Sequence, residues 1–452
     1  MASEFAQFME EHPTVFHFTQ GIADTLNRAG FLEIFESDFP RLERGGRYYV
    51  NRNDSNLIAF EIGENFVPGL DGFVVSSAHI DANRLSLKPS SLKPSVAGYE
   101  RLGAAVYGGP KLASWFDRDL GLGGRAVVRT KHGIEARLVR LPGTVGTIPS
   151  LAPHFGDTKA PNLETNFVPI VGASGTEAPA VAEAPAVAGG TEAPDSIRRQ
   201  HSAALLEALA AQLHCAVDDI LELELELFSS ERPTIGGLRG DMLMCSRMDD
   251  RLCAYTSVLG LVASAGNADH AVKMVALYDN EEVGSLTRTG GYNKLMEVVM
   301  GVVHESLGST RDERVQSAAN SLSLSADVTH AVNPNYTHMY AEGHMPRLNT
   351  GMTVKQLGRF TSNAIDAALC QLVAEKSGIP LQRFAPRNDT RSGGTIGPMR
   401  AASLGIRTID IGIPVLAMHS VREVTGVEDI PLGIKWFKAY FELANELVLQ
   451  DV

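Results

Sequence analysis

The sequence predicts an α/β protein in which a mixed sheet is flanked by helices and a β-rich domain is inserted into the chain. Short apolar runs alternate with helix-like segments towards both ends of the chain, a pattern typical of a sheet with helices on both faces. The middle of the chain carries short β-like runs instead, interrupted by one low-complexity segment. The simplest arrangement is an α/β domain formed by residues 1–91 and 237–452, with the β-rich domain at residues 92–236.

Four apolar runs are predicted to be buried strands, because short continuous runs of this kind are typical of strands covered on both faces. They are residues 73–77 (FVVSS), 273–278 (KMVALY), 322–326 (LSLSA) and 406–412 (IRTIDIG). The helix-like stretches of the same domain are residues 250–266, 363–378 and 434–450.

The middle region contains the β-like runs 125–130 (RAVVRT) and 135–142 (EARLVRLP), followed by a helix-like stretch at 201–214. Residues 172–195 repeat alanine, proline, glutamate and glycine without an aromatic residue. Such a segment cannot bury enough apolar surface to offset the entropy of ordering it, so we expect a mobile loop there.

The composition excludes several classes of protein. With 452 residues, 44% of them apolar, and a net charge of −13, the chain has the balance of a globular protein and lacks the basic face of a nucleic-acid binder. Its four cysteines form no CxxC pair, which argues against a disulfide framework and a zinc ribbon. We find neither a signal-peptide core nor an apolar run of about 18 residues, so we expect no membrane span and a cytoplasmic location.

Carboxylates and imidazoles follow the predicted strands. Ligand sites in open α/β sheets lie at the carboxyl ends of strands, so side chains at these positions are expected to meet. Those in question are His79 and Asp81 after the first run, Asp279, Glu281 and Glu282 after the second, Asp327 after the third, His419 beyond the fourth, and Asp249 and Asp250 at the start of a helix.

Each pair has an ordinary explanation when taken alone. A His-x-Asp pair can be a surface feature, Glu-Glu can complement a helix dipole, and Asp-Asp can cap a helix. A shared metal site explains all of them together. Nitrogen and oxygen donors without thiolate suit zinc, manganese or cobalt. The predicted ligands are His79, Asp249, Glu282, Asp327 and His419.

The ligand set predicts two metal ions, because it holds more donors than one open catalytic site requires. Two neighbouring cations need an anion between them, and Asp249 is the candidate bridge. His79 and Asp327 would complete one ligand shell, and Glu282 and His419 the other. Asp81 is predicted to orient His79 by accepting its second ring N–H. Glu281 is left free to act as a general base.

The segments that carry these residues resemble motifs of the aspartyl aminopeptidase family, metallopeptidase family M18. They are AHIDANRLSLKP, SRMDDRL, LYDNEEVGS, SADVTHAVNPNY, RNDTRSGGTIGP and PVLAMHSVRE, and the resemblance extends to HPTVFHF near the start and to VYGGPKLASWFDRDLGLGGR and IPSLAPHF in the inserted region. The resemblance implies a dinuclear zinc aminopeptidase with the ligands and base named above. It also implies that the inserted domain is a dimerisation domain and that the chain forms a tetrahedral homododecamer.

Two further residues are assigned through this resemblance. His154, in IPSLAPHF, is similar to a family histidine that reaches into a neighbouring subunit's active site. Lys355 is similar to a family lysine that holds an acidic substrate side chain, which implies a preference for N-terminal Asp or Glu. The family places Arg-Tyr six residues after that lysine, whereas here Arg359-Phe360 follows two residues sooner. A neutral, Leu-type preference is therefore the alternative.

Other functions remain open at this point. A two-metal carboxypeptidase or N-deacylase would use similar ligands but would need a cationic grip on a substrate carboxylate. A non-catalytic shell or cargo protein could keep the fold for its oligomer, and a structural oligomer could merely bind zinc. A complete ligand set together with the unliganded Glu281 favours the peptidase.

Overall fold

The computed structural model of this protein describes residues 1–156, 161–174, 196–266, 269–390 and 393–448. The chain divides into two compact units. The first comprises Met1–Ala82, Pro233–Met418 and Arg422–Val452, and the second comprises Asn83–Arg232 and His419–Val421. Each unit has a hydrophobic core of its own.

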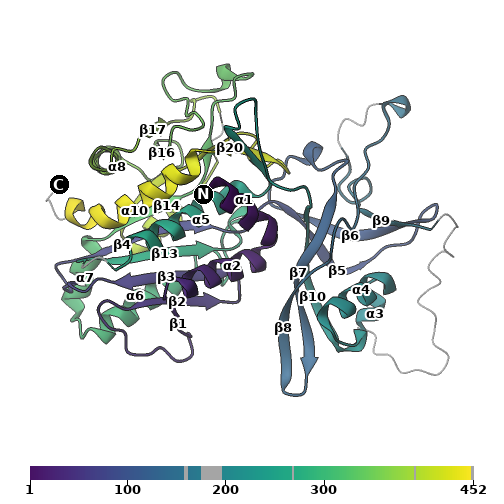
Figure 1. The fold of residues 1–452 in the computed structure, drawn as a ribbon, viewed down its shortest axis with the longest axis horizontal. Helices are drawn as coiled ribbons and strands as arrows, with labels where there is room; N and C mark the ends of the chain where they lie inside the picture. Colours follow the sequence, from purple (N-terminus) through teal and green to yellow (C-terminus); the bar gives the residue numbers. More distant parts are fainter. Residues whose placement is uncertain (157–160, 175–195, 267–268, 391–392, 449–452) are drawn as a thin grey trace. The chain divides into compact units, whose positions relative to one another are not determined.

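A mixed sheet forms the centre of the first unit (Figure 1). Nine strands of the described chain form it, in the order β1 (Leu32–Glu33), β2 (Arg47–Arg52), β3 (Asn56–Ile62), β13 (Val272–Tyr278), β4 (Phe73–His79), β14 (Leu322–Ala326), β18 (Arg407–Gly412), β16 (Met352–Lys355) and β17 (Leu381–Phe384). The strands β13, β4, β14 and β18 run parallel to their neighbours in this group, so their carboxyl ends lie at one edge. The four strands predicted from the sequence are confirmed, because they correspond to β4, β13, β14 and β18.

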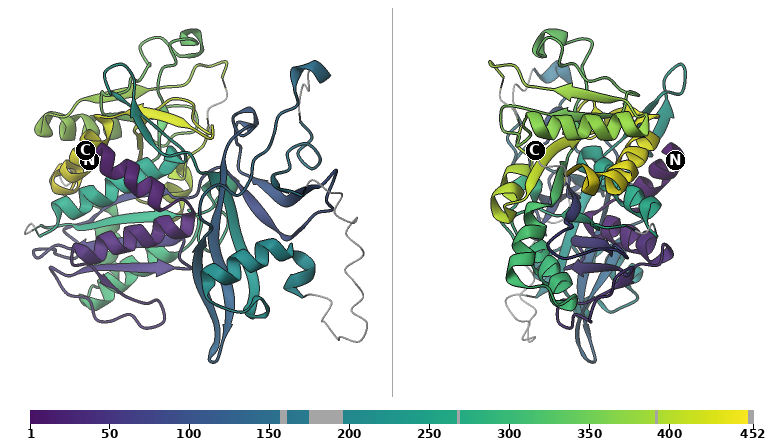
Figure 2. Two further views of the ribbon diagram at one scale, coloured as in Figure 1. Left: turned by 45° about the vertical axis from the view of Figure 1, so that its right-hand side comes forward. Right: turned by 90° about the vertical axis from the view of Figure 1, so that its left-hand side faces the viewer.

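Helices cover both faces of this sheet, as Figures 1 and 2 show from several sides. One core contains residues of α1 (Ala2–Glu11), α2 (Val15–Arg28), α5 (Met248–Ser264), α8 (Ala364–Ser377) and α10 (Asp429–Val448). The core on the other face takes side chains from α6 (Leu295–Ser306), α7 (Arg311–Ala319) and α9 (Gly397–Leu404). Strand β13 shows the alternation, since Val275 and Leu277 pack into the first core and Met274 and Ala276 into the second. The predicted mixed sheet flanked by helices is confirmed.

Local sequence signals explain where several of these helices begin and end. Thr310 with Glu313, and Asn363 with Asp366, form capping boxes that satisfy free backbone N–H groups at the starts of α7 and α8. Helix α8 ends at Gly378, whose φ of 68° favours glycine. The three helix-like stretches predicted for this domain correspond to α5, α8 and α10.

The second unit is built on an antiparallel sheet. Counted over the described residues, six strands form it, in the order β8 (Gly133–Arg140), β7 (Leu120–Thr130), β10 (Ile220–Ser229), β5 (Arg84–Leu92), β6 (Tyr99–Tyr107) and β9 (Ile170–Ala173). Helices α3 (Ile197–Gln200) and α4 (Ala203–Leu213) contribute to its core. Residues 84–91 belong to this sheet, although the sequence-based boundary assigned them to the flanking domain, because β5 pairs with β6 and β10.

The predicted mobile loop at 172–195 lies largely outside the described residues, which exclude 175–195. Its first two residues, Gly172 and Ala173, are not loop but the end of β9, which pairs with β6.

The first unit also contains two smaller sheets. One is β11 (Thr234–Gly236), β12 (Met242–Cys245) and β20 (Glu423–Gly426), and the other is β15 (Thr329–His330) and β19 (Pro414–Val415). Short 3-10 helices are η1 (Leu112–Ser114), η2 (Pro153–Phe155), η3 (Val217–Asp219), η4 (Glu281–Val283) and η5 (Thr337–Met339). Among the described helices, none combines the length and hydropathy needed to cross a membrane.

Candidate metal centre

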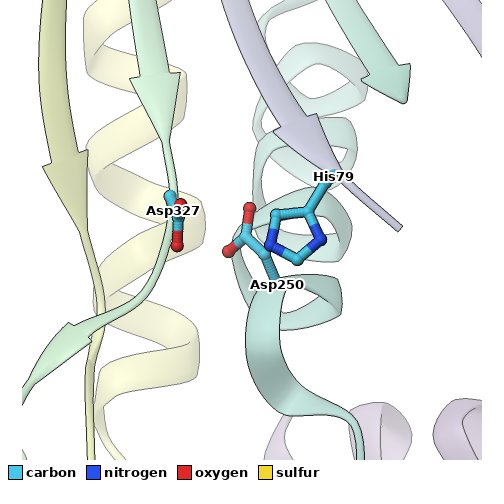
Figure 3. Close-up of side chains that lie close together, drawn as sticks. All are labelled: His79, Asp250 and Asp327. Atoms are coloured by element: carbon cyan, nitrogen blue, oxygen red, sulfur yellow. The ribbon is translucent and has the colours of Figure 1, made fainter. Parts of the chain in front are cut away.

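The candidate site lies at the carboxyl ends of three neighbouring parallel strands of the first unit. Strand β4 ends at His79, β14 is followed directly by Asp327, and β13 leads into η4, which begins with Glu281. The first turn of α5 brings Asp249 and Asp250 to the same edge. Figure 3 shows His79 and Asp327 at the ends of their strands, with Asp250 on the helix between them.

His79, Asp250 and Asp327 form one group of metal-ligating side chains. Each offers a ligand atom, these atoms lie within 4.8 Å of one another, and all three residues are buried. The structure thus brings together His79 and Asp327, which the sequence assigned to one ion. It adds Asp250, whose Oδ1 also accepts the backbone N–H of Val328 at 3.1 Å.

Asp249 lies between the two predicted ligand shells. Its Oδ1 is 3.3 Å from Nε2 of His79. One of its carboxylate oxygens also lies within 4.8 Å of a carboxylate oxygen of Glu282. A carboxylate that approaches a ligand of each shell occupies the position that a bridge between two cations requires.

Asp81 fixes both the ring of His79 and the turn that carries the two glutamates. Nδ1 of His79 is 3.1 Å from the backbone oxygen of Asp81 and 3.3 Å from its Oδ1, so the ring N–H on this side has acceptors. The other nitrogen, Nε2, is left facing Asp249. The Asp81 carboxylate accepts the backbone N–H groups of Glu281 and Glu282, each at 3.1 Å. Outer partners of this kind orient metal-binding imidazoles and turns.

The site concentrates negative charge where water is largely excluded. Burial raises the pKa of Glu281 to about 7; His79 opposes this shift, while Asp327, Asp81 and Asp249 add to it. Burial also raises the pKa of Asp327, against the effect of Lys355, which lies 3.8 Å away. Buried carboxylates that disfavour one another's ionisation are stabilised by a bound cation.

The donor set fits a divalent transition metal. Imidazole nitrogen and carboxylate oxygens at the strand ends suit zinc, manganese or cobalt. Cys253, one turn further along α5, does not change this set, because it belongs to neither group of ligating side chains among the described residues.

Lys355 lies beside a predicted ligand. It ends strand β16 and is buried. Its ammonium donates to the backbone oxygen of Val328 at 3.0 Å and lies 3.8 Å from Oδ1 of Asp327. The centre of the Phe360 ring lies 5.5 Å from the same nitrogen. The lysine is therefore adjacent to the metal centre, with an aromatic side chain next to it.

His154 and His419 belong to the second unit. His154 is exposed on η2. His419 is the first residue of a short segment that joins this unit, and it follows Met418 of the first unit directly in the chain. Its Nδ1 is 3.0 Å from the backbone oxygen of Gly109, and its φ of 65° is unusual for a residue with a side chain. The roles of both histidines stay predictions.

Two carboxylates near the ligands received no role from the sequence. Asp250 was grouped with the residues expected to meet at the site, but it was not assigned as a ligand. Glu423 accepts backbone N–H groups at the start of α5, and the sequence placed it four residues after His419 without assigning it a role. In both cases, the sequence signal that could have indicated a role was a position within four residues of a proposed ligand.

The comparisons with known proteins agree with this geometry. The family described as "Aminopeptidase I zinc metalloprotease (M18)" matches residues 8–441. An aspartyl aminopeptidase of Aspergillus oryzae is 36% identical over 98% of this chain and 95% of its own length. Vacuolar aminopeptidase 1 of Saccharomyces cerevisiae is 36% identical over 98% of this chain and 88% of its own.

A solved structure extends the likeness to three dimensions. The mApe1 dodecamer of Saccharomyces cerevisiae superposes with a TM-score of 0.86 and 32% identity, covering 99% of this chain and 97% of that one. A family match over nearly the whole length and a site with the donors of a metallopeptidase lead to one conclusion: this chain belongs to the M18 family of zinc aminopeptidases.

Proposed function

We propose that this protein removes single residues from the N-termini of peptides with a dinuclear metal centre, and that it prefers N-terminal Asp or Glu. The observation that carries the proposal is the place of Glu281. It lies beside Glu282, its backbone is held by Asp81, and it belongs to neither group of ligating side chains within the described residues, so its carboxylate is left to accept and return a proton.

Two divalent ions would be held by five side chains. Asp249 would bridge them, His79 and Asp327 would complete one shell, and Glu282 and His419 the other. The ions are zinc in this proposal, with manganese and cobalt as alternatives. Such a pair, when bound, lowers the pKa of a water molecule and polarises the scissile carbonyl.

The protein's own residues handle the proton and the substrate. Glu281 takes the proton from the attacking water and passes it to the leaving amine, so one carboxylate serves both halves of the reaction. Asp81 holds the His79 ring and the turn that carries Glu281 in fixed positions during both proton transfers. The metal centre, when occupied, would offer a binding position for the free α-amino group of the peptide, which would limit cleavage to the first residue.

The acidic preference rests on Lys355. A substrate carboxylate that enters an enclosed site loses its hydration, and a cation must offset that cost. Lys355 supplies a buried cation beside Asp327. The shorter spacing between Lys355 and Arg359 makes a neutral preference the competing outcome, and the contacts of Lys355 with Val328 and Phe360 favour the same alternative.

We further propose that the chain works in the cytoplasm as a tetrahedral homododecamer built from dimers through the inserted domain. The dodecameric structure of the yeast relative supports the assembly. His154 would complete the site of a neighbouring subunit. The acidic net charge argues against nucleic acid as a partner, and the proposal gives the chain peptides as substrates and no membrane.

A panel of chromogenic substrates that differ in their N-terminal residue tests the proposal, with the apo-enzyme reloaded with zinc, manganese or cobalt. We expect cleavage of free N-terminal substrates, fastest for Asp and Glu, and none of their N-acetylated forms. Cleavage of acetylated substrates would indicate an N-deacylase or a related amidohydrolase. No cleavage by fully metal-loaded protein would favour a shell or cargo protein.

A further inference from the structure

Glu423 makes two backbone contacts at the start of the helix that carries Asp249. It is the first residue of β20, and its side chain is 1% exposed. Its Oε2 accepts the N–H of Met248 at 2.6 Å and the N–H of Asp249 at 3.1 Å. One buried oxygen therefore holds two consecutive peptide groups, one of which belongs to the proposed bridging residue.

The first turn of α5 needs such an anchor because it is not a regular helical turn. Arg247 precedes it with a φ of 62° and no side-chain cap. Asp249 has φ −80° and ψ 108°, and Asp250 has φ −112° and ψ 23°, so neither follows the helical path. The orientation of the Asp249 carboxylate cannot be set by regular helix hydrogen bonds and must come from contacts outside the helix.

The same arrangement recurs at the other ligand-bearing segments. The Asp81 carboxylate holds the N–H groups of Glu281 and Glu282, and Asp250 holds the N–H of Val328, next to Asp327. Each of these segments is thus fixed through its backbone by a carboxylate from another part of the chain. Glu423 does this for the segment that carries the bridge.

We propose that Glu423 is a positioning residue that sets Asp249 between His79 and Glu282 without itself binding metal, an inference that rests on the proposed dinuclear site. The hydrogen bonds from Met248 and Asp249 go to a single oxygen, so a shift of that acceptor would disturb both at once. A negative charge next to the N-terminus of a helix is also favourable, which explains why a carboxylate is tolerated there.

Two substitutions separate position from charge. Glu423→Gln keeps the length and an acceptor oxygen but removes the charge, whereas Glu423→Asp keeps the charge and withdraws the oxygen by one methylene. Zinc affinity is measured on the full-length chain by competition with a chelator. We expect Glu423→Gln to stay within about threefold of wild type and Glu423→Asp to lose about 10- to 100-fold, as outer-shell changes usually do.

Asp429 provides a matched control. Its buried carboxylate accepts the N–H groups of Asn349, Thr350 and Gly351 at 2.6–2.9 Å, away from the ligand-bearing turns. Asp429→Glu should lower the thermal midpoint of the apo-protein while leaving zinc affinity unchanged.

Three outcomes would overturn the inference. The first is wild-type zinc affinity in Glu423→Asp, and the second is a loss in Glu423→Gln as large as in Glu423→Asp. A loss in the Asp429→Glu control equal to that in Glu423→Asp would also contradict it, because any buried backbone anchor would then matter. A wild-type chain that binds no zinc would instead contradict the proposed function itself.

Discussion

Glu281 and Glu282 are neighbours in the chain, yet their side chains have different surroundings. Glu282 shares a ligand group with Asp249, whereas Glu281 belongs to neither group of ligating side chains within the described residues. Burial and nearby carboxylates raise the pKa of Glu281 to about 7. At the scale of single residues, the difference between the proposed ligand and the proposed base therefore comes from the different surroundings of two adjacent side chains.

The substitution Glu281→Gln tests the base. It keeps the size of the side chain and removes its ability to accept a proton, so kcat should fall by about 10²- to 10⁴-fold while zinc content stays at the wild-type level. Metal analysis of the purified variant and steady-state kinetics measure the two effects. Asp249→Ala is the contrasting variant and should lose zinc. Full activity in Glu281→Gln would contradict the assignment.

Lys355 tests the substrate preference at the same scale. We expect wild-type enzyme to prefer N-terminal Asp and Glu over Leu and Ala, and Lys355→Met to abolish or invert that order. The substitution should lower kcat/KM for Asp substrates by about 10- to 100-fold. This loss corresponds to the free energy of a charge-assisted contact, about 1.5–3 kcal/mol. Zinc content must be measured in parallel, because the lysine lies 3.8 Å from Asp327.

The exposed Lys294 supplies the control for this experiment, since Lys294→Met removes a surface cation at the N-cap of α6 and should leave the preference unchanged. Wild-type enzyme that cleaves Leu substrates faster than Asp and Glu substrates would contradict the acidic preference. It would leave the metal chemistry intact, because none of the proposed ligands is involved.

At the scale of elements, α5 and α10 pack closely against each other in the helical layer behind the site. Gly260 of α5 faces α10, and a β-carbon added there would lie 2.5 Å from Cβ of Phe437. Gly301 of α6 has open space in the same position, with nothing within 4 Å. Two helical glycines of the first unit thus differ in what surrounds them, although both are poor helix formers in principle.

Alanine at these two positions should act in opposite directions. Gly260→Ala should destabilise the protein by about 1–3 kcal/mol, because overpacking forces α5 and α10 apart. Gly301→Ala should stabilise it by about 0.5–1 kcal/mol, because alanine restricts the unfolded chain and suits a helix better. Urea unfolding of the apo-proteins measures both. Equal effects of the same sign would show that helix propensity, and not packing against Phe437, decides.

At the scale of the whole molecule, the two units contribute different parts of the proposed enzyme. The first contains the group of His79, Asp250 and Asp327, and the second contains the exposed His154 on η2. The proposed assembly gives the exposed histidine a function that it cannot have as a solvated side chain of an isolated subunit.

Mixed oligomers test this proposal. His154→Ala chains and Glu281→Gln chains should each be inactive, and activity should return after they are co-assembled, because some sites then receive an intact histidine and an intact base. Oligomers mixed from Glu281→Gln and the double variant Glu281→Gln/His154→Ala cannot recover and serve as the control. No recovery in demonstrably mixed oligomers would place His154 outside the active site.

The sequence by itself determined the fold class and the residues around which the site is built. Buried strands appear as short apolar runs, and a polar residue directly after such a run can only lie at the end of the strand. His79 and Asp327 were therefore predicted to meet, and the structure brings their ligand atoms within 4.8 Å of each other. The proposed base, Glu281, came from the same reasoning, because it follows β13.

The tertiary structure alone decided which side chains hold those residues in place. Asp250 contacts the backbone of Val328 across 78 positions of the chain, and Glu423 contacts Met248 across 175. Lys355 lies beside Asp327 only because β16 and β14 both neighbour β18 in the sheet. A local sequence pattern identifies the type of a side chain and the helix or strand that carries it. The partners of that side chain depend on the order in which distant strands pair, which no local pattern contains.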